Sequence, residues 1–226
     1  RIPGKEEVPS PDRAAMEKCQ SRWLSIAKPL FGLGTLEDAV TQMAGMTGTA
    51  DVSIDKKGLI VMCADNGVVE EGISQTDSSV TAVVTDNFSR GLTSACIMSR
   101  AAGVDVFPIV IGVAADTKVY TDKIAYGTKN MLKEPAMTRE EAEGSILAGI
   151  RAAKRLKKEG YQILLTGEMG IGNTTTSSAV ASVLLGEDPE RLSGRGAGLS
   201  DAGLQRKREV IRRAIGLWKP DPADPI

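Results

Sequence analysis

The sequence predicts an α/β fold in which helices cover both faces of a parallel sheet. Three short apolar runs, at residues 58–64, 104–114 and 161–166, are typical of buried strands. Stretches with helical periodicity lie between them, and strands that alternate with helices form parallel sheets. Glycine-containing turns follow the first and third runs, at the edge where parallel sheets bind ligands.

The chain begins with two helical stretches that have no strand between them. One apolar face of residues 12–27 carries Met16, Cys19, Trp23 and Ile26. The segment "KPLFGLG" interrupts this pattern, and a second helix then aligns Leu36, Val40 and Met43. Gly48 is a plausible stop for that helix. We expect these helices to form a layer separate from the sheet.

Helical stretches also flank each predicted strand. The stretch 79–102 is interrupted near Gly91. Pro108, inside the second strand, indicates an edge position or a bulge because proline lacks the N–H that a central strand must donate. Thr138 and Glu141 have the spacing of a capping box and open a long helix before the third strand.

Composition narrows the class of protein. The 226 residues include 28 Lys and Arg against 29 Asp and Glu, which argues against a general nucleic-acid or membrane-surface binder. No apolar run is long enough to span a bilayer. Three widely separated cysteines favour neither zinc nor a disulfide framework, and predict a reducing cytoplasm. The absence of histidine excludes imidazole bases and His-rich metal sites from this sequence.

The segment "GEMGIGNTTTSSA", residues 167–179, has the layout of a phosphate cradle between a strand and a helix. Its spacing fits a P-loop, but Asn173 stands where the lysine belongs and Glu168 adds a negative charge. An ATPase or a kinase is therefore disfavoured. A dinucleotide fingerprint also fails, because its third glycine is missing. A turn that needs glycines only for packing is the alternative.

A second glycine-rich turn, "SGRGAG", enters the last predicted helix at residues 201–218, and the chain then ends in the linker-like "KPDPADPI". This turn supplies Arg195, and Lys207 follows within the helix. Taken alone, Lys207 reads as a solvated member of the run "RKR". Two glycine turns with basic residues nearby favour a site for a phosphomonoester.

Five segments, in order, resemble the nicotinate-nucleotide–dimethylbenzimidazole phosphoribosyltransferases. They are "KPLFGLGTLE", "ADNGVVEEGIS", "GTKNMLKEPAMT", "GEMGIGNTT" and "GRGAGL", and they span nearly the whole chain. The resemblance implies transfer of phosphoribose from nicotinate mononucleotide to an aromatic base such as dimethylbenzimidazole, in cobalamin biosynthesis. It implies no metal, no cofactor and a homodimer.

The resemblance also implies a fold and a set of site residues. Residues 36–226 would form a Rossmann-like α/β domain, and residues 1–35 would be part of a small helical domain. Glu168 would stabilise positive charge on the departing pyridinium and the ribosyl carbon; a purely structural carboxylate is the alternative. The nucleotide phosphate would lie among Gly170, Ile171, Gly172, Asn173, Thr174, Arg195, Gly196, Gly198 and Lys207. The acceptor base would lie near Asp65, Asn66 and Ser74, although Ser74 also fits an ordinary surface loop.

Two departures from the family pattern leave alternatives open. The family's usual "DHG" is Asp65-Asn66-Gly67 here, so this position cannot titrate. The family chain continues past the equivalent of Ile226, and that part carries the glutamate regarded as the general base. The sequence is thus expected to be a fragment or a natural truncation. A relative acting on phenols and a non-catalytic nucleotide-binding remnant are the rival functions.

Overall fold

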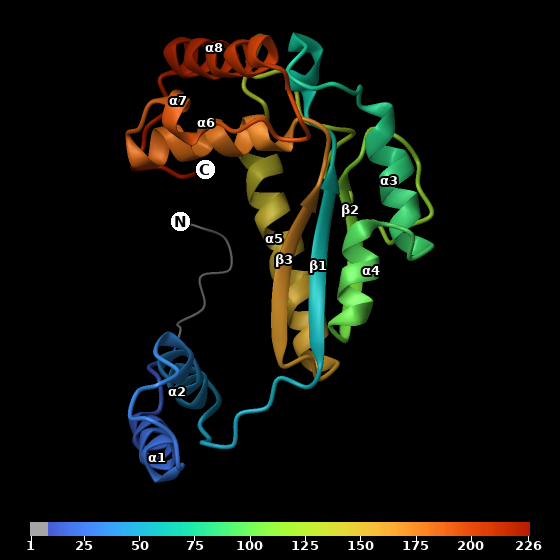
Figure 1. The fold of residues 1–226 in the computed structure, drawn as a ribbon. Coiled ribbons are helices and arrows are strands. Elements are labelled where there is room, and N and C mark those ends of the chain that lie inside the picture. Colours follow the sequence, from blue (N-terminus) through green and yellow to red (C-terminus); the bar gives the residue numbers. More distant parts are fainter. Residues whose placement is uncertain (1–8) are drawn as a thin grey trace. The chain divides into compact units, whose positions relative to one another are not determined.

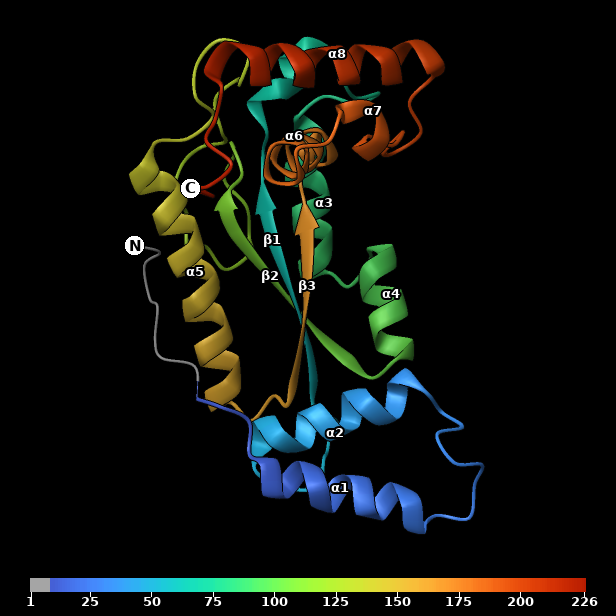
Figure 2. The same ribbon diagram turned by 90° about the vertical axis from the view of Figure 1, so that its left-hand side faces the viewer.

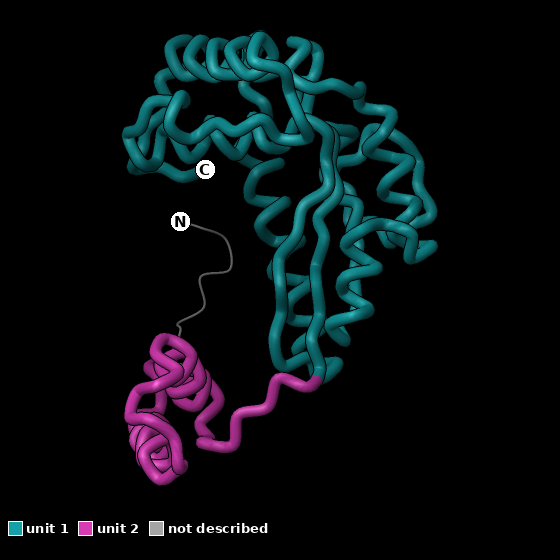
Figure 3. Tube along the Cα trace, viewed as in Figure 1, with its two compact units in different colours: residues 1–4, 56–226 teal, residues 5–55 magenta. Residues whose placement is uncertain are grey.

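The structure is a computed structural model that describes residues 9–226, and the chain divides into two compact units (Figure 3). The smaller unit spans residues 5–55, and the larger one includes residues 56–226. The domain boundary expected at residue 35 stays a prediction. Among the described residues, no helix combines the length and the apolar character that crossing a bilayer requires.

The smaller unit contains two packed helices, α1 (Arg13–Ser25) and α2 (Thr35–Thr47). The Asp12 side chain caps α1 by accepting a hydrogen bond from the backbone N–H of Ala15 at 3.0 Å. Gly48 ends α2 in the left-handed conformation, with φ at 70°, so the predicted stop is confirmed.

The buried stripe of α2 differs from its aligned apolar positions. Leu36 is 56% exposed, whereas Glu37, Thr41 and Ala44 are buried. Small side chains on this stripe let α1 pack closely against α2. Glu37 is tolerated there because the Nζ of Lys28 lies 2.7 Å from its carboxylate.

The larger unit is built on a three-stranded parallel sheet in the order β2-β1-β3. Its strands are β1 (Lys57–Ala64), β2 (Val104–Gly112) and β3 (Ile163–Met169). The predicted α/β fold with a parallel sheet is therefore confirmed. Pro108 lies on β2, an edge strand of this sheet, as its missing N–H predicts.

Helices cover both faces of the sheet (Figures 1 and 2). On one face, α3 (Ser79–Ser89) and α4 (Ser94–Ala101) pack over a core that contains Cys63. On the other, α5 (Arg139–Lys158) packs against a core that contains Ile60. Neighbouring positions of β1 thus point into opposite layers, which explains why its sequence is continuously apolar.

Two helix boundaries follow the local signals of the sequence. Gly91, with φ at 67°, separates α3 from α4. The side chain of Thr138 accepts from the N–H of Glu141 at 3.2 Å, and the Glu141 carboxylate accepts from the N–H of Thr138 at 2.8 Å. The capping box predicted for α5 is confirmed.

The remaining elements follow the ends of β1 and β3. They are the 3₁₀ helix η1 (Gly67–Glu71) and the helices α6 (Asn173–Leu185), α7 (Pro189–Leu192) and α8 (Asp201–Trp218). The linker expected at the end of the chain folds back instead. Arg139 donates two hydrogen bonds to the Asp224 carboxylate, at 3.0 and 3.3 Å, because this tail passes the start of α5.

Candidate functional site

The third strand ends three residues later than the sequence predicts, at Met169, so the first glycine turn is shorter than expected. Residues 167–169 were expected in the turn, but they continue the hydrogen-bonded ladder of β3 with β1 as far as Cys63. Only residues 170–172 form the turn, since α6 begins at Asn173. The backbone therefore passes directly from a parallel strand into a helix N-terminus, where free N–H groups favour an anion.

Glycine is required at both ends of this turn. A Cβ atom on Gly170 would lie 2.1 Å from the carbonyl oxygen of Ala64, far inside contact distance. Gly172 has φ at 85°, a conformation that other residues rarely adopt. The first glycine allows β1 and the turn to approach closely, and the second allows the chain to enter α6.

The two glycine turns meet in space. A Cβ atom on Gly196 would lie 3.0 Å from the Oγ1 of Thr174, in the first turn of helix α6 directly after the glycine turn, and 4.0 Å from the Nζ of Lys207 in α8. Gly196 and Gly198 both have positive φ, at 55° and 105°, so the second turn also depends on glycine. The structure thus brings together the turns that the sequence separates by more than twenty residues.

Lys207 is a buried cation at this junction. Its side chain is 1% exposed, so the interpretation of Lys207 as a solvated member of the run "RKR" is wrong. Nζ donates to Thr174 Oγ1 at 2.8 Å and to the carbonyl oxygen of Gly194 at 3.1 Å. Burial lowers its pKa, and within residues 9–226 no carboxylate forms an ion pair with it. A buried charge that lacks a protein counter-ion favours an anionic ligand.

The turns enclose a cavity of about 80 Å³. Its walls include residues 73–75, 170–174 and 195–197. In the described part of the chain, the backbone N–H groups of Gly172, Gly196 and Ala197 donate to no acceptor. Free N–H groups beside a buried ammonium group suit a small anion such as a phosphate group.

Two other residues that were predicted to bind the phosphate, Arg195 and Gly198, form hydrogen bonds that stabilise the second turn. Arg195 donates to the carbonyl oxygen of Leu199 at 2.9 Å and forms an ion pair with Asp201. The carbonyl oxygen of Gly198 accepts from the side chain of Gln75. Arg195 lines the cavity, but its present hydrogen bonds hold the turn rather than reach into the cavity.

Glu168 lies near the end of β3, paired with Met62 of β1. The residue as a whole is exposed, but neighbouring protein displaces enough water to raise the pKa of its carboxyl group. The Asn173 side chain opposes this shift without cancelling it. Glu168 does not line the small cavity, so it is placed beside the anion site and not in it.

The three predicted acceptor residues separate into two groups. Ser74 lines the cavity. Asp65 is buried at the end of β1, where Oδ2 accepts from the N–H of Ala114 at 2.8 Å and Oδ1 has no partner among the described residues. Asn66 is also buried, and its side chain contacts the first glycine turn.

Sequence reasoning missed two residues that hold the turns. Thr81 of α3 is fully buried, and its hydroxyl accepts from the N–H of Ile171 at 3.1 Å. Gln75 bridges to Gly198 from the loop after η1. Thr81 shares the buried face of α3 with Thr85 and Phe88, so its hydroxyl is a weak signal in the sequence. Gln75 gives no signal, because its partner Gly198 is distant in the sequence.

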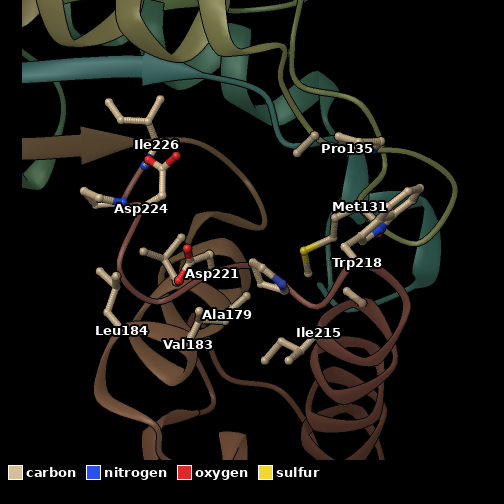
Figure 4. Close-up of a pocket in the computed structure, with 15 residues that line it drawn as sticks. Met131, Pro135, Ala179, Val183, Leu184, Ile215, Trp218, Asp221, Asp224 and Ile226 are labelled. Carbon is tan, nitrogen blue, oxygen red and sulfur yellow. Dashed lines mark hydrogen bonds between the residues drawn. The ribbon is translucent and has the colours of Figure 1, made fainter. Parts of the chain in front are cut away.

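A larger, apolar pocket of about 300 Å³ lies between α6, α8 and the C-terminal tail (Figure 4). Its walls include Met131, Val183, Leu184 and Trp218, and the indole N–H of Trp218 donates to the carbonyl oxygen of Met131 at 2.7 Å. None of the predicted site residues lines it. With Asp221 and Asp224 as its acidic groups, it lacks the cations that would bind a phosphate.

Comparison with known proteins identifies the family. A model of a family described as phosphoribosyltransferase matches residues 8–226. The chain is 49% identical over 214 residues to a nicotinate-nucleotide–dimethylbenzimidazole phosphoribosyltransferase of Ruminiclostridium cellulolyticum, covering 93% of this chain and 61% of the relative. It is 48% identical over 218 residues to the protein of that name from Clostridium acetobutylicum, covering 95% and 62%.

A solved structure agrees with this result. The fold superposes on CobT from Thermus thermophilus with a TM-score of 0.86 and 36% sequence identity, covering 92% of this chain and 63% of that one. The chain spans about three fifths of the length of these relatives. On the family match over residues 8–226, the chain belongs to the phosphoribosyltransferase family.

Proposed function

We propose that the chain binds the phosphate of nicotinate mononucleotide between its two glycine turns and transfers the phosphoribosyl group to an aromatic base. The acceptor is dimethylbenzimidazole or a similar base, and the products are α-ribazole phosphate and nicotinate, in cobalamin biosynthesis. The names of the relatives support this activity. The observation that carries it is the buried Lys207, which lies beside free backbone N–H groups and forms no ion pair with any carboxylate of residues 9–226.

The cavity is suited to one phosphomonoester group. The N–H of Gly172 at the start of α6 and those of Gly196 and Ala197 would donate to the phosphate oxygens. The Nζ of Lys207 would add a charge-assisted hydrogen bond. A triphosphate with its magnesium ion is not required, which accounts for Asn173 at the position of a P-loop lysine.

Glu168 would act on the other side of the donor. The bond that breaks joins the ribose to a pyridinium nitrogen, and the ribosyl carbon gains positive charge as nicotinate departs. A carboxylate next to the phosphate cradle would stabilise that charge. Burial raises the pKa of Glu168, and positive charge that develops next to the carboxyl group would favour its ionised form.

The role of Glu168 is tested by separating cleavage from transfer. The variant Glu168→Gln of a full-length relative or of this chain should slow both the exchange of labelled nicotinate and transfer to dimethylbenzimidazole. Normal exchange with lost transfer would make Glu168 the general base instead.

Ser74 and Asp65 would lie near the aromatic acceptor, with apolar contacts dominating. The three cysteines are buried and free of disulfides, which supports a reducing, cytoplasmic setting. The resemblance implies a homodimer, with residues 1–35 contributing to a small helical domain.

Calorimetry provides the decisive binding test for this chain. Nicotinate mononucleotide should bind, and nicotinate riboside, which lacks only the phosphate, should bind at least about tenfold more weakly, since charged hydrogen bonds are lost. Equal affinity for the two compounds would overturn the phosphate assignment. Formation of α-ribazole phosphate, followed by chromatography, then tests the transfer itself.

A further inference from the structure

The Asn66 side chain is held on both sides by the first glycine turn and the helix that follows it. Its Nδ2 donates to the carbonyl oxygen of Ile171 at 3.2 Å, and its Oδ1 accepts from the hydroxyl of Thr176 at 3.1 Å, a hydroxyl shared with the carbonyl oxygen of Asn173 at 2.8 Å. The residue is 6% exposed and does not line the small cavity. Its amide therefore faces the backbone of the turn instead of the space that a ligand would occupy.

These contacts orient one peptide group. The carbonyl of Ile171 and the N–H of Gly172 belong to the same planar, trans peptide, so they point in opposite directions. Fixing the carbonyl toward Asn66 directs the Gly172 N–H away from Asn66, and Gly172 is part of the cavity wall. This N–H donates to no acceptor in residues 9–226.

The opposite orientation of this peptide would be harmful to an anion site. A flip would turn the carbonyl oxygen of Ile171 toward the cavity and remove the free N–H from it. Gly172 makes such a flip accessible, because glycine adopts positive and negative φ about equally. The neighbouring N–H of Ile171 is held separately by Thr81, at 3.1 Å, so the Asn66 donor is the contact that selects the orientation of the next peptide.

We propose that Asn66 is a positioning residue for the anion site, which keeps the Gly172 N–H directed at the bound phosphate. The inference rests on the proposed function of the cavity. It changes the expected role of Asn66: the residue would control affinity for the phosphate group and not the choice of aromatic acceptor.

The variant Asn66→Asp provides a test because it nearly preserves shape and removes only the donor. As a carboxylate, the new side chain has no donor for the carbonyl oxygen of Ile171, and two acceptors would face each other. The flipped peptide, which turns its N–H toward the carboxylate, would then be favoured. Once protonated, it would regain an O–H donor for the same carbonyl. Loss of binding should therefore be reversed by acid, which a simple packing defect would not produce.

Inorganic sulfate is a suitable probe, since it keeps its charge where an aspartate titrates. At about pH 8, sulfate affinity of Asn66→Asp should be about tenfold or more below that of the unaltered chain, as expected for a charge-assisted contact. Near pH 4.5 the difference should shrink, because burial at this position raises the pKa of the new carboxyl group above the ordinary value of about 3.9 and allows it to protonate. The control Asn87→Asp places the same charge on α3, away from the cavity, and should bind sulfate like the unaltered chain at both values.

The outcomes separate the two proposals. Failure of the unaltered chain to bind sulfate, phosphate and nicotinate mononucleotide would overturn the proposed function. Binding by the unaltered chain with an equally tight, pH-independent Asn66→Asp variant would overturn the positioning role alone. If circular dichroism shows that Asn66→Asp is unfolded, Thr176→Val decides. Removing the hydroxyl that orients Asn66 should reduce the sulfate-induced NMR shift of the Gly172 amide, and an unchanged shift would contradict the inference.

Discussion

The small cavity and the apolar pocket both lie beside α6 and α8, but different groups line them. The cavity of about 80 Å³ is formed at the N-terminal end of α6, where free backbone N–H groups lie near Thr174, whose hydroxyl accepts from the buried Lys207 just behind the cavity wall. The pocket of about 300 Å³ lies farther along α6, where Val183 and Leu184 meet Trp218 of α8. The first depends on the direction of backbone groups, and the second on apolar side-chain volume. Changes to one should therefore leave the other intact.

The largest effect is expected from Gly170→Ala. The added methyl group would lie 2.1 Å from the carbonyl oxygen of Ala64, so the turn or β1 must move. We expect the free energy of unfolding to fall by about 3 kcal/mol, at the upper end of overpacking effects. Urea denaturation measures it. Gly216→Ala is the control, because Gly216 is exposed on α8 and a Cβ atom there would meet nothing, so the change should stabilise the chain by roughly 0.5–1 kcal/mol.

Lys207→Met tests the polar cavity without closing it. Losing one charged hydrogen bond should weaken binding of nicotinate mononucleotide by about 1.5–3 kcal/mol, while the free energy of unfolding of the unliganded chain does not fall comparably. Arg213→Met removes a charge from the exposed side of the same helix and should leave affinity unchanged. Calorimetry and denaturation of both variants provide the measurement. Equal losses in the two variants would mean that general electrostatic attraction, and not the cavity, binds the nucleotide.

The titration of Lys207 sharpens the same point. Burial lowers its pKa below the ordinary 10.5, so the ammonium group costs stability at lower pH and this cost disappears as pH rises through the folded-state pKa. Sulfate affinity should fall as Lys207 loses its proton, and this fall should begin below pH 10.5. Calorimetry across this range should show a step that Lys207→Met abolishes. A step of the same size in that variant would assign it to another group.

A smaller effect is expected in the apolar pocket. Trp218→Ala removes the hydrogen bond to Met131 and part of the apolar wall, but Trp218 is 45% exposed. We expect a loss of roughly 1–2 kcal/mol in the free energy of unfolding, below the range for a fully buried tryptophan. Sulfate affinity should not change. Leu217→Ala, at a more exposed position, is the control and should be nearly neutral. A large change in sulfate affinity would show that the small cavity and the apolar pocket are coupled.

The smallest effect concerns Ser74, which lines the cavity and whose hydroxyl accepts from the N–H of Thr76 at 3.4 Å. In Ser74→Ala, the ratio of rates for benzimidazole and dimethylbenzimidazole should shift by at most about tenfold, since even the loss of a whole methyl contact changes discrimination by only about 1–3 kcal/mol. Affinity for nicotinate mononucleotide should change less. Competition between the two acceptors in one reaction gives the ratio directly. An effect confined to the nucleotide would move Ser74 to the phosphate site.

Local signals in the sequence were sufficient for most of the framework. The capping box at Thr138, the stop at Gly48 and the break at Gly91 act through hydrogen bonds and dihedral angles within a few residues. Pro108 marks an edge strand for the same local reason. Glycine spacing likewise indicated two turns that open helices, because the need for positive φ belongs to single residues.

Burial and long-range pairing were decided by the tertiary structure. Nothing near Lys207 in the sequence distinguishes it from the exposed Arg206 and Arg213 of the same helix. Lys207 is removed from water only in the folded chain, where Thr174 and Gly194 approach its ammonium group. Asn66 reaches Ile171 across 105 positions of the chain. Local propensity carries no information about such contacts, since their free energy comes from desolvation and from hydrogen bonds between segments that meet only when the sheet has formed.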